Sequence, residues 1–474
     1  MDKNTSTRAP GAALNTVGKN IAKGKGLREL ARFAAAADLR TLPAEVVEKA
    51  KACLLYAMAV GAAGLRMPQA RQAVEVVAGA SAGKSTRYFD DEKCDAGHAA
   101  FANGTLFHVR VQDDAHPAGH VGVVVIPTAL AVAEAAGAGG GALLAAVAAG
   151  YEVALRIGRD HAADLSARGF RTTPAYGVFG AAAAAGRLLG LDATRMGHAL
   201  SLAANMAGGL REYSEAGSNE YAFQAGAAAS NGIMAARLAA AGATSAPTAL
   251  DGAAGFFRAY GEAGRRYGAA LAVDLGKTFE MMAVTYKPYP VCQFHRGIIR
   301  GCAALHAQTK GAAPAALTVR MHPFEADFYG VRFTGPFTTF PQAFMSAPFC
   351  AALAWARGDA TLAGLTDFTA ADVLALVPRV AVVADASRER YDPVVSARLA
   401  DGTELKWHEP ERANTYALTW DAAIGMTEKL LAEVGVAPAQ AEQLVDAVSG
   451  LHNCPSVEPT IAALRRACRS ARGR

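Results

Sequence analysis

The sequence of 474 residues is too long for one small hydrophobic core, so two domains are the default expectation. Its 52% of hydrophobic and 19% of charged residues describe a well-buried globular protein and exclude a disordered one. The net charge of +5 comes from Lys and Arg near the two ends, in 1–30 and 465–474, so the remaining chain is net negative and lacks the basic patch of a nucleic-acid binder.

The seven cysteines are scattered without a C-x-x-C pair, which indicates reduced thiols rather than a disulfide framework or a zinc site. The N-terminus has no apolar core ahead of a cleavage site, so it is not a secretory signal. The most membrane-like window, residues 135–151, is too short and too weakly hydrophobic to span a bilayer. We therefore expect a soluble, cytoplasmic protein with no membrane partner.

Ala-rich helices separated by short turns are predicted from Gly26 to about Tyr267. Pro43 should lie in the first turn of one helix, and Asp192 should cap another. Residues 1–24 are predicted to form a flexible tail.

The pattern changes after Gly276. The prolines of KPYP (287–290) exclude a helix, and residues 316–323 and 379–386 resemble strands. Ala400-Asp401-Gly402 lies between two further strands and indicates a hairpin. Thr369 and Asp372 have the spacing of a capping box. A small α+β domain is expected here, before the chain becomes helical again from about Arg412.

The segment 101–130 is crowded with ionisable residues. His108, His116, His120, Asp113 and Asp114 lie among Gly and Pro residues, directly before an apolar run. Ionisable groups next to a buried segment tend to lie in a cleft where protons are transferred. The alternative is a solvated loop in which an Asp caps the next helix and the His residues are incidental.

Several stretches, in this order, are similar to those of the MmgE/PrpD family. They are LPAEVVEKAK (42–51), FANGTLFHVRVQDDAHPAGHVGVVVIPTALAVAEA (101–135), RGFRTTPAYGVFGAAAAAGRLLGLDA (168–193), FQAGAAASNGIMAARLA (223–239), LDGAAGFFRAYG (250–261), TYKPYPVCQFH (285–295) and PFTTFPQAFMSAPFCAALA (336–354). The resemblance implies a mainly α fold: a large all-helical domain built from both ends of the chain, a smaller α+β lid, a cleft between them, and a homodimer.

With the boundaries read from the sequence, the helical domain comprises 25–275 and 412–474, and the lid comprises 276–411. Family members act without a cofactor on small polycarboxylates: a base removes a proton α to a carboxylate, and the next step distinguishes dehydratase, decarboxylase and epimerase. We therefore expect a small polycarboxylate substrate, no cofactor and no metal. The sequence also lacks a P-loop and a G-x-G-x-x-G after a strand.

His120, followed by Val121-Gly122, matches the family histidine that opens the site, and it is the first candidate for the base. Asp113 and Asp114 match the tandem acids that precede it if one gap is allowed. With no gap, Val111 and Gln112 fall opposite the family's acidic pair, and either alignment leaves one acid of dehydratase-like members missing. Asp113 could equally cap a helix or orient His116, which is itself a catalytic candidate. Arg110 and Lys287 are further candidate cations for substrate carboxylates, although Lys287 lies in a rigid hinge where a structural role is simplest.

Three positions depart from the family pattern. Arg171 stands where many relatives have histidine, and Tyr221 stands where dehydratase- and decarboxylase-like relatives have lysine. Arg296, or His295 if the register slips by one, occupies another family histidine position. Arginine binds carboxylates well but exchanges protons poorly, so a lyase would need Tyr221 or His295 as its acid. Each of these residues could instead be structural.

Together these features favour a hydro-lyase similar to 2-methylcitrate dehydratase. The departures give weight to an alternative, an epimerase similar to iminodisuccinate epimerase, because epimerisation needs no acid to help hydroxide leave. A second alternative is a carboxylate-binding member of the family that has lost catalysis.

Overall fold

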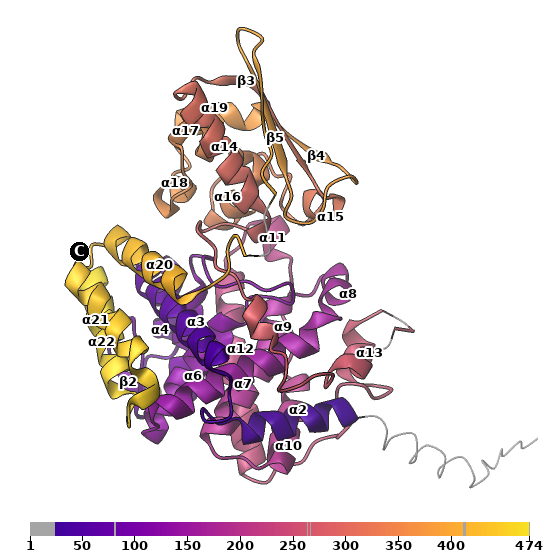
Figure 1. Ribbon diagram of the computed structural model, residues 1–474, viewed down its shortest axis with the longest axis vertical. Coiled ribbons are helices and arrows are strands. Elements are labelled where there is room, and N and C mark those ends of the chain that lie inside the picture. Colours follow the sequence, from indigo (N-terminus) through magenta and orange to yellow (C-terminus); the bar gives the residue numbers. More distant parts are fainter. Residues whose placement is uncertain (1–23, 80–81, 263, 266, 411–413, 474) are drawn as a thin grey trace, which may run out of the picture.

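A computed structural model of the chain describes residues 24–473, apart from 80–81, 263, 266 and 411–413. The predicted tail, except for Gly24, lies outside the described residues. Figure 1 shows a large helical part and, above it, a smaller part that contains a sheet. We call elements α2–α13 and α20–α22 the helical body, and elements η3 to β6 (Gln293–Trp407) the α+β unit.

The helical body is built from helices joined by short turns, as the alternation of Ala-rich stretches and turn residues predicts. They are α2 (Lys25–Ala36), α3 (Ala44–Ala63), α4 (Pro68–Val76), α5 (Ala96–His108), α6 (Gly122–Ala136), α7 (Gly140–Arg159), α8 (Ala162–Ala167), α9 (Thr172–Leu188), α10 (Ala193–Ala204), α11 (Tyr213–Ala216), α12 (Glu220–Ala240), α13 (Phe256–Tyr260), α20 (Trp420–Glu433), α21 (Pro438–Ser449) and α22 (Glu458–Arg472). Short elements between them are β1 (Ser85–Thr86), β2 (Lys93–Cys94), η1 (Gly268–Ala270), η2 (Glu280–Ala283) and η5 (Leu451–Asn453).

The centre of the body is formed by α6, α7 and α9, whose side chains are almost all buried, and by α12, which buries only part of its surface. Small residues allow close backbone approach there: a Cβ on Gly180 of α9 would lie 2.7 Å from the carbonyl oxygen of Gly150 in α7. Among the described helices, α7 alone is long and apolar enough to cross a membrane, but 89% of its apolar window is buried by protein. It is a central helix of the body.

The α+β unit carries a four-stranded mixed sheet in the order β4-β3-β5-β6. The strands are β3 (Pro314–Met321), β4 (Val380–Ala384), β5 (Val394–Leu399) and β6 (Glu404–Trp407). β4 runs parallel to β3, whereas β5 is antiparallel to both β3 and β6. The other elements are η3 (Gln293–His295), α14 (Arg296–Thr309), α15 (Pro323–Ala326), α16 (Phe340–Met345), α17 (Ala347–Arg357), α18 (Leu362–Thr366), α19 (Ala371–Leu376) and η4 (Val377–Arg379).

Two chain segments connect the helical body to the α+β unit, and they pair with each other. Thr285 forms isolated β-bridges both to Ala417, in the returning segment, and to Ala115, in the loop between α5 and α6. Lys49 of α3 donates hydrogen bonds to the carbonyls of Val284 (2.6 Å) and Leu418 (2.9 Å). Because of these contacts, the ionisable α5–α6 loop lies at the junction of the two parts.

Within the helical body, the C-terminal helices α20, α21 and α22 lie against the N-terminal helices, with α20 packed along α3 (Figure 1). The sequence-based strand and hairpin predictions are confirmed, as are Pro43 at the start of α3 and Asp192 as the cap of α10. The capping box at Thr369 is wrong. The Thr369 hydroxyl donates to Asp367 at 2.7 Å, and α19 begins after Ala370 without a side-chain cap.

Candidate active site

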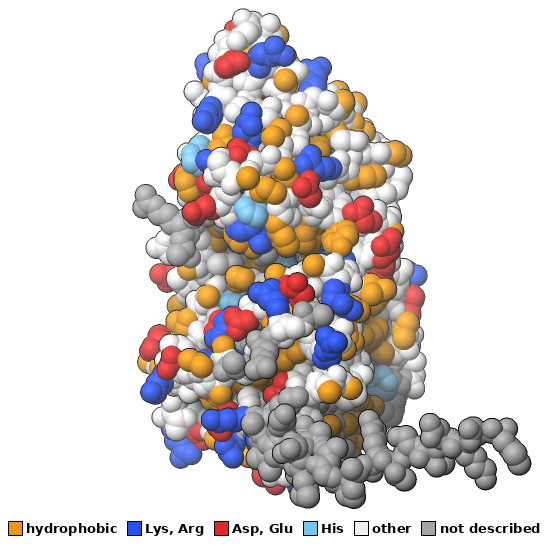
Figure 2. All heavy atoms as spheres, turned by 90° about the vertical axis from the view of Figure 1, so that its right-hand side faces the viewer, with side chains coloured by type: hydrophobic (Ala, Val, Ile, Leu, Met, Phe, Trp, Pro, Cys, Tyr) orange, Lys and Arg blue, Asp and Glu red, His pale blue; other side chains and the backbone are white. Residues whose placement is uncertain are grey.

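A cavity of about 390 Å³ lies between the helical body and the α+β unit. Figure 2 shows this side of the molecule, with hydrophobic side chains gathered along the indentation between the two parts. From the body come His108, Val111, His116, Pro117, Gly119, His120, Arg159, Ala162, Ala163, Ser166, Arg171, Thr172, Thr173, Arg211 and Tyr213. From the segment entering the α+β unit, and from the unit itself, come Lys287, Val291, Cys292, Gln293, Phe294, Phe324, Phe328, Phe344, Met345, Arg390 and Tyr391.

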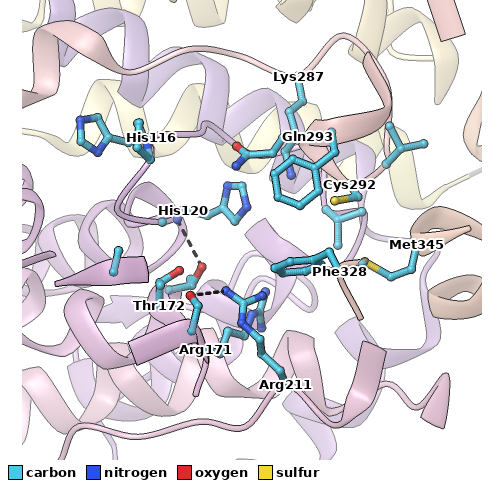
Figure 3. Close-up of a pocket in the computed structure, with 18 of the residues that line it drawn as sticks. His116, His120, Arg171, Thr172, Arg211, Lys287, Cys292, Gln293, Phe328 and Met345 are labelled. Carbon is cyan, nitrogen blue, oxygen red and sulfur yellow. Dashed lines mark hydrogen bonds between the residues drawn. The ribbon is translucent and has the colours of Figure 1, made fainter. Parts of the chain in front are cut away.

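A tight turn in the α5–α6 loop presents two of the histidines to the cavity. The backbone amide of His116 donates to the carbonyl of Gly119 (3.2 Å), and the amide of Gly119 donates back (2.8 Å). Gly119 has φ of 135°, and a Cβ there would lie 3.0 Å from the Thr172 hydroxyl, so glycine is required. The turn places His116 and His120 on the same side of the cavity (Figure 3).

Asp113 is buried behind the cavity wall and contacts three cationic or titratable side chains. Its carboxylate lies 3.0 Å from Lys287 Nζ, 3.2 Å from His108 Nδ1 and 3.7 Å from His120 Nδ1. Burial acts to raise the pKa of Asp113, but these neighbours outweigh it and hold the pKa well below its usual range. The alternative roles of helix cap or partner of His116 do not apply, because α6 has no side-chain cap and Glu280 faces His116.

His120 has a defined tautomer. Its Nδ1 lies 2.7 Å from the carbonyl oxygen of Asp114, which only accepts, so Nδ1 carries the proton and Nε2 keeps its lone pair. Its backbone amide donates to the Thr173 hydroxyl at 3.2 Å. Burial, followed by the charge of Lys287, lowers the pKa of His120 to about 3, so the ring is neutral at pH 7. A neutral ring with an available Nε2 can accept a proton.

Asp114 points away from the cavity. Its Oδ2 accepts a hydrogen bond of 2.5 Å from Tyr151 in α7, and burial raises its pKa to about 7. Gly122 makes room for this pair, because a Cβ there would lie 2.5 Å from Asp114 Oδ2 and 2.2 Å from the Tyr151 hydroxyl. Asp114 therefore acts on the site through its backbone carbonyl.

Arg171 contacts His108, which in turn contacts Asp113. Arg171 donates to the carbonyl of Tyr221 (2.5 Å) and to Gln224 (3.1 Å), and its other terminal nitrogen contacts His108 Nε2. Because arginine only donates, His108 must accept at Nε2 and carry its proton on Nδ1, toward Asp113. Burial lowers the pKa of His108 to about 4, in agreement with a neutral ring.

Three further arginines line the cavity, and none of them was among the residues predicted from the sequence. Arg211 donates to Ser166 (3.0 Å) and lies over the ring of Phe328 at 4.6 Å. Arg159 pairs with Glu280, and Arg390 pairs with Glu325. No local motif marks these positions, because each arginine reaches the cavity only through the tertiary fold. With Arg171 and Lys287 they give the cavity five cationic side chains, of which Arg159, Arg390 and Lys287 are paired with carboxylates.

His116 lines the cavity beside Arg159. Its Nδ1 accepts from the amide of Ala118 at 3.1 Å, which leaves the proton on Nε2, 3.8 Å from Glu280. Burial lowers the pKa of His116 to about 4. The ring can therefore donate a hydrogen bond, and it is neutral at pH 7.

Besides Asp113 and Asp114, four predicted site residues do not line the cavity. The Tyr221 hydroxyl donates to the carbonyl of Val109 at 2.6 Å, and burial raises its pKa. His295 is fully buried, and burial lowers its pKa to about 4. Arg296 donates to the carbonyl of Tyr286 and stacks over Tyr416.

Arg110, the fourth of these residues, is buried in a structural network. It donates to the carbonyl of Ala63, to Gln112 and to Glu433 of α20. It thus ties the α5–α6 loop to the C-terminal helices, and the expected contact with a substrate carboxylate does not occur through this cavity.

Residues 28–266, just over half of the chain, match the model of the MmgE/PrpD N-terminal domain. The chain belongs to the MmgE/PrpD family. A cis-aconitate decarboxylase-like protein of Aspergillus oryzae is 30% identical over 212 residues, which are 41% of this chain and 43% of that protein. The cis-aconitate decarboxylase of Homo sapiens is 32% identical over 232 residues (48% and 44%), and that of Aspergillus terreus is 26% identical over 304 residues (61% and 61%). The matches thus span less than two thirds of these relatives' lengths.

These relatives are named as decarboxylases, which are lyases, so the chain is similar to enzymes of that class. Within the described residues, no group of three or more His, Cys, Asp or Glu side chains is arranged to hold a metal ion. That this protein needs no metal, flavin or nucleotide stays a prediction.

Tyr221→Phe should leave catalysis nearly intact, because the Tyr221 hydroxyl bonds to backbone and does not reach the cavity. Loss of this buried hydrogen bond should cost about 1–3 kcal/mol of unfolding free energy, since the Val109 carbonyl loses its donor. Urea unfolding and turnover at saturating substrate measure the two effects. A more than hundredfold loss of turnover in folded protein would contradict this prediction and indicate that Tyr221 takes part in catalysis.

Asp114→Asn should remove a pH dependence of stability. The folded pKa of Asp114 is about 7, against an ordinary value of 3.8, so the folded state retains a proton that the unfolded state releases. This group therefore destabilises the fold progressively as pH rises from about 4 to 7, by about 4 kcal/mol in total. The difference between the unfolding free energies of the wild type and the variant, taken at each pH, gives the contribution of Asp114 without that of the histidines. A flat difference would contradict the assignment.

Proposed function

We propose that this protein is a lyase that removes a proton α to a carboxylate of a small di- or tricarboxylate, with His120 as the base. The observation that carries the proposal is the joint contact of His120 and Lys287 with the Asp113 carboxylate. Both side chains line the cavity, whereas Asp113 lies behind them. Asp113 is therefore a positioning residue for a base and a cationic acid.

The cationic lining supports a substrate with several carboxylates. Arg171, Arg211 and Arg390 lie on different elements around the cavity, and guanidinium groups bind carboxylates with paired hydrogen bonds. A cation next to the forming enolate also stabilises the negative charge that develops when the α-proton leaves. We assign this role to Lys287, whose charge acts on His120.

The low pKa of His120 belongs to the cavity without substrate. Burial and the charge of Lys287 disfavour the imidazolium form. A bound carboxylate would bring negative charge next to the ring and raise that pKa, because opposite charges stabilise the protonated form. His120 Nε2 then takes the α-proton, while Lys287 can donate a proton to the departing hydroxyl group as the carbon–oxygen bond breaks.

The shared carboxylate also bears on the choice between lyase and epimerase. Asp113 holds His120 and Lys287 on neighbouring sides of one group, which suits removal of a proton and a leaving group from the same side of the substrate. Epimerisation needs proton exchange on two opposite faces of one carbon. We therefore favour the lyase and keep the epimerase as the alternative. The ordered cluster argues against a member that has lost catalysis.

We further propose that the α+β unit acts as the lid of a discontinuous helical domain, and that the protein is a homodimer. The return of α20 to α3 and the paired connecting segments at Thr285 support the first point. Sedimentation equilibrium would test the second.

The experiment that tests the function is a survey of deuterium exchange in D₂O with citrate, 2-methylcitrate, cis-aconitate and malate. A lyase should incorporate deuterium at the α-carbon and form or consume an unsaturated acid or release carbon dioxide. Exchange with recovery of the inverted stereoisomer alone would indicate the epimerase. Absence of exchange with every member would contradict the proposed chemistry on these substrates.

A further inference from the structure

The two sides of the cavity differ in chemistry. The helical body contributes histidines, arginines and two threonines, whereas the segment 291–391 contributes mostly apolar side chains. These apolar side chains are Val291, Phe294, Phe324, Phe328, Phe344 and Met345. In Figure 3, Phe328, Cys292 and Met345 lie across the cavity from His116 and His120.

Three of these residues form a cluster that we call the aromatic wall: Phe294, Phe324 and Phe328. The ring centroids of Phe294 and Phe328 lie 5.0 Å apart, and those of Phe324 and Phe328 lie 5.7 Å apart. Arg390 stacks over Phe324 at 4.2 Å, and Arg211 stacks over Phe328 at 4.6 Å. These contacts order the rings before any ligand binds.

The aromatic wall leaves apolar surface open to the cavity. Phe324 is 36% exposed although it lines the site, and phenylalanine at that exposure inside a cleft indicates a binding surface. A small substrate made only of carboxylates and hydroxyl groups would satisfy the cationic side and leave this wall without an apolar partner. Ligand sites of this size usually combine an apolar wall with a few polar anchors.

We propose that the substrate carries, besides its carboxylates, an apolar group larger than methyl that packs against the aromatic wall. This inference rests on the proposed function, because the carboxylates must bind on the cationic side near His120. The chemical class is then a substituted succinate or citrate with a butyl-sized alkyl chain or an aryl group.

Binding of unreactive 2-alkylsuccinates tests the inference independently of catalysis. Isothermal titration would compare 2-methyl-, 2-butyl- and 2-benzylsuccinate with the full-length protein. Each buried methylene should strengthen binding about fourfold, so 2-butylsuccinate should bind at least tenfold more tightly than 2-methylsuccinate. Equal or weaker binding of the longer chain would overturn the proposal.

Variants locate the effect. Phe328→Ala should reduce the butyl-over-methyl preference at least fivefold, and Phe324→Ala, a change at a more exposed ring, gives a second test if the first variant folds poorly. Phe368→Ala is the matched control, since Phe368 is a partly buried phenylalanine of the α+β unit that does not line this cavity. An unchanged preference in both wall variants would overturn the assignment.

Deuterium exchange with methyl- and butyl-substituted citrate separates this inference from the proposed function. A butyl preference in binding without exchange of either compound would support the aromatic wall and reject the proton-transfer chemistry on citrates. Exchange of the methyl compound without any gain from the butyl chain, in binding or in rate, would reject the aromatic wall alone.

Discussion

Replacement of His120 by alanine should lower solvent deuterium incorporation into a true substrate by about a thousandfold, the usual contribution of a positioned general base. The reason is geometric. The hydrogen bond from His120 Nδ1 to the carbonyl of Asp114 leaves Nε2 as an acceptor, and the ring lines the cavity. Proton nuclear magnetic resonance in D₂O, at equal concentrations of folded protein, measures the rate.

The loss should appear in the turnover rate more than in substrate affinity, because the arginines and Lys287 that hold the carboxylates remain. His452→Ala is a suitable control, since the His452 ring contacts the carbonyl of Ser449 and His452 does not line the cavity. Wild-type exchange in the His120 variant would exclude His120 as the base.

Much of the fold could be predicted because the signals were local. Pro43 marks the start of α3, the prolines of residues 287–290 exclude a helix, and the turn at Asp401 joins β5 and β6. The capping box at Thr369 failed for an equally local reason: Asp367 offers a nearer acceptor, and side chains of this kind compete for the same backbone and hydroxyl groups.

The residues of the cavity wall could be predicted where they lie on the α5–α6 turn, at the start of α9 or at the entry to the α+β unit. His116, His120, Arg171 and Lys287 line the cavity, and their roles in catalysis and substrate binding stay predictions. Sequence adjacency does not give side-chain direction, however. Phe294 lines the cavity, whereas the next residue in the sequence, His295, is buried away from it.

Long-range packing explains the remaining differences. Arg211 and Arg390 lie in short stretches without a recognisable motif and approach the cavity from opposite parts of the chain. Tyr221, by contrast, follows a family position but turns its hydroxyl to the carbonyl of Val109. In place of a lysine at this position, the structure offers Lys287, already paired with Asp113, as the cation next to the base.

Removal of the Lys287 charge should have the largest effect on stability. Lys287 and Asp113 are each 2% exposed, and their atoms lie 3.0 Å apart. Lys287→Met leaves a buried carboxylate without its principal cation, which should cost about 3–5 kcal/mol of unfolding free energy. Lys287→Met combined with Asp113→Asn should recover much of that loss, because the second change removes the unpaired charge.

The pH dependence of the unfolding free energy is a second measure of the interaction between Asp113 and Lys287. The folded pKa of Asp113 lies well below its ordinary value, so its contribution to stability is present above about pH 4 and is lost as pH falls through the folded pKa. In Lys287→Met, the strongest charge that opposes the effect of burial on Asp113 is gone, so the pKa of Asp113 should rise and the loss of stability should begin at higher pH. Both single variants and the double variant should lose deuterium exchange, since Lys287 and the positioning of His120 are disturbed. Additive unfolding energies in the double-mutant cycle would show that Asp113 and Lys287 do not interact, and the proposed base–acid pair would then lose its common anchor.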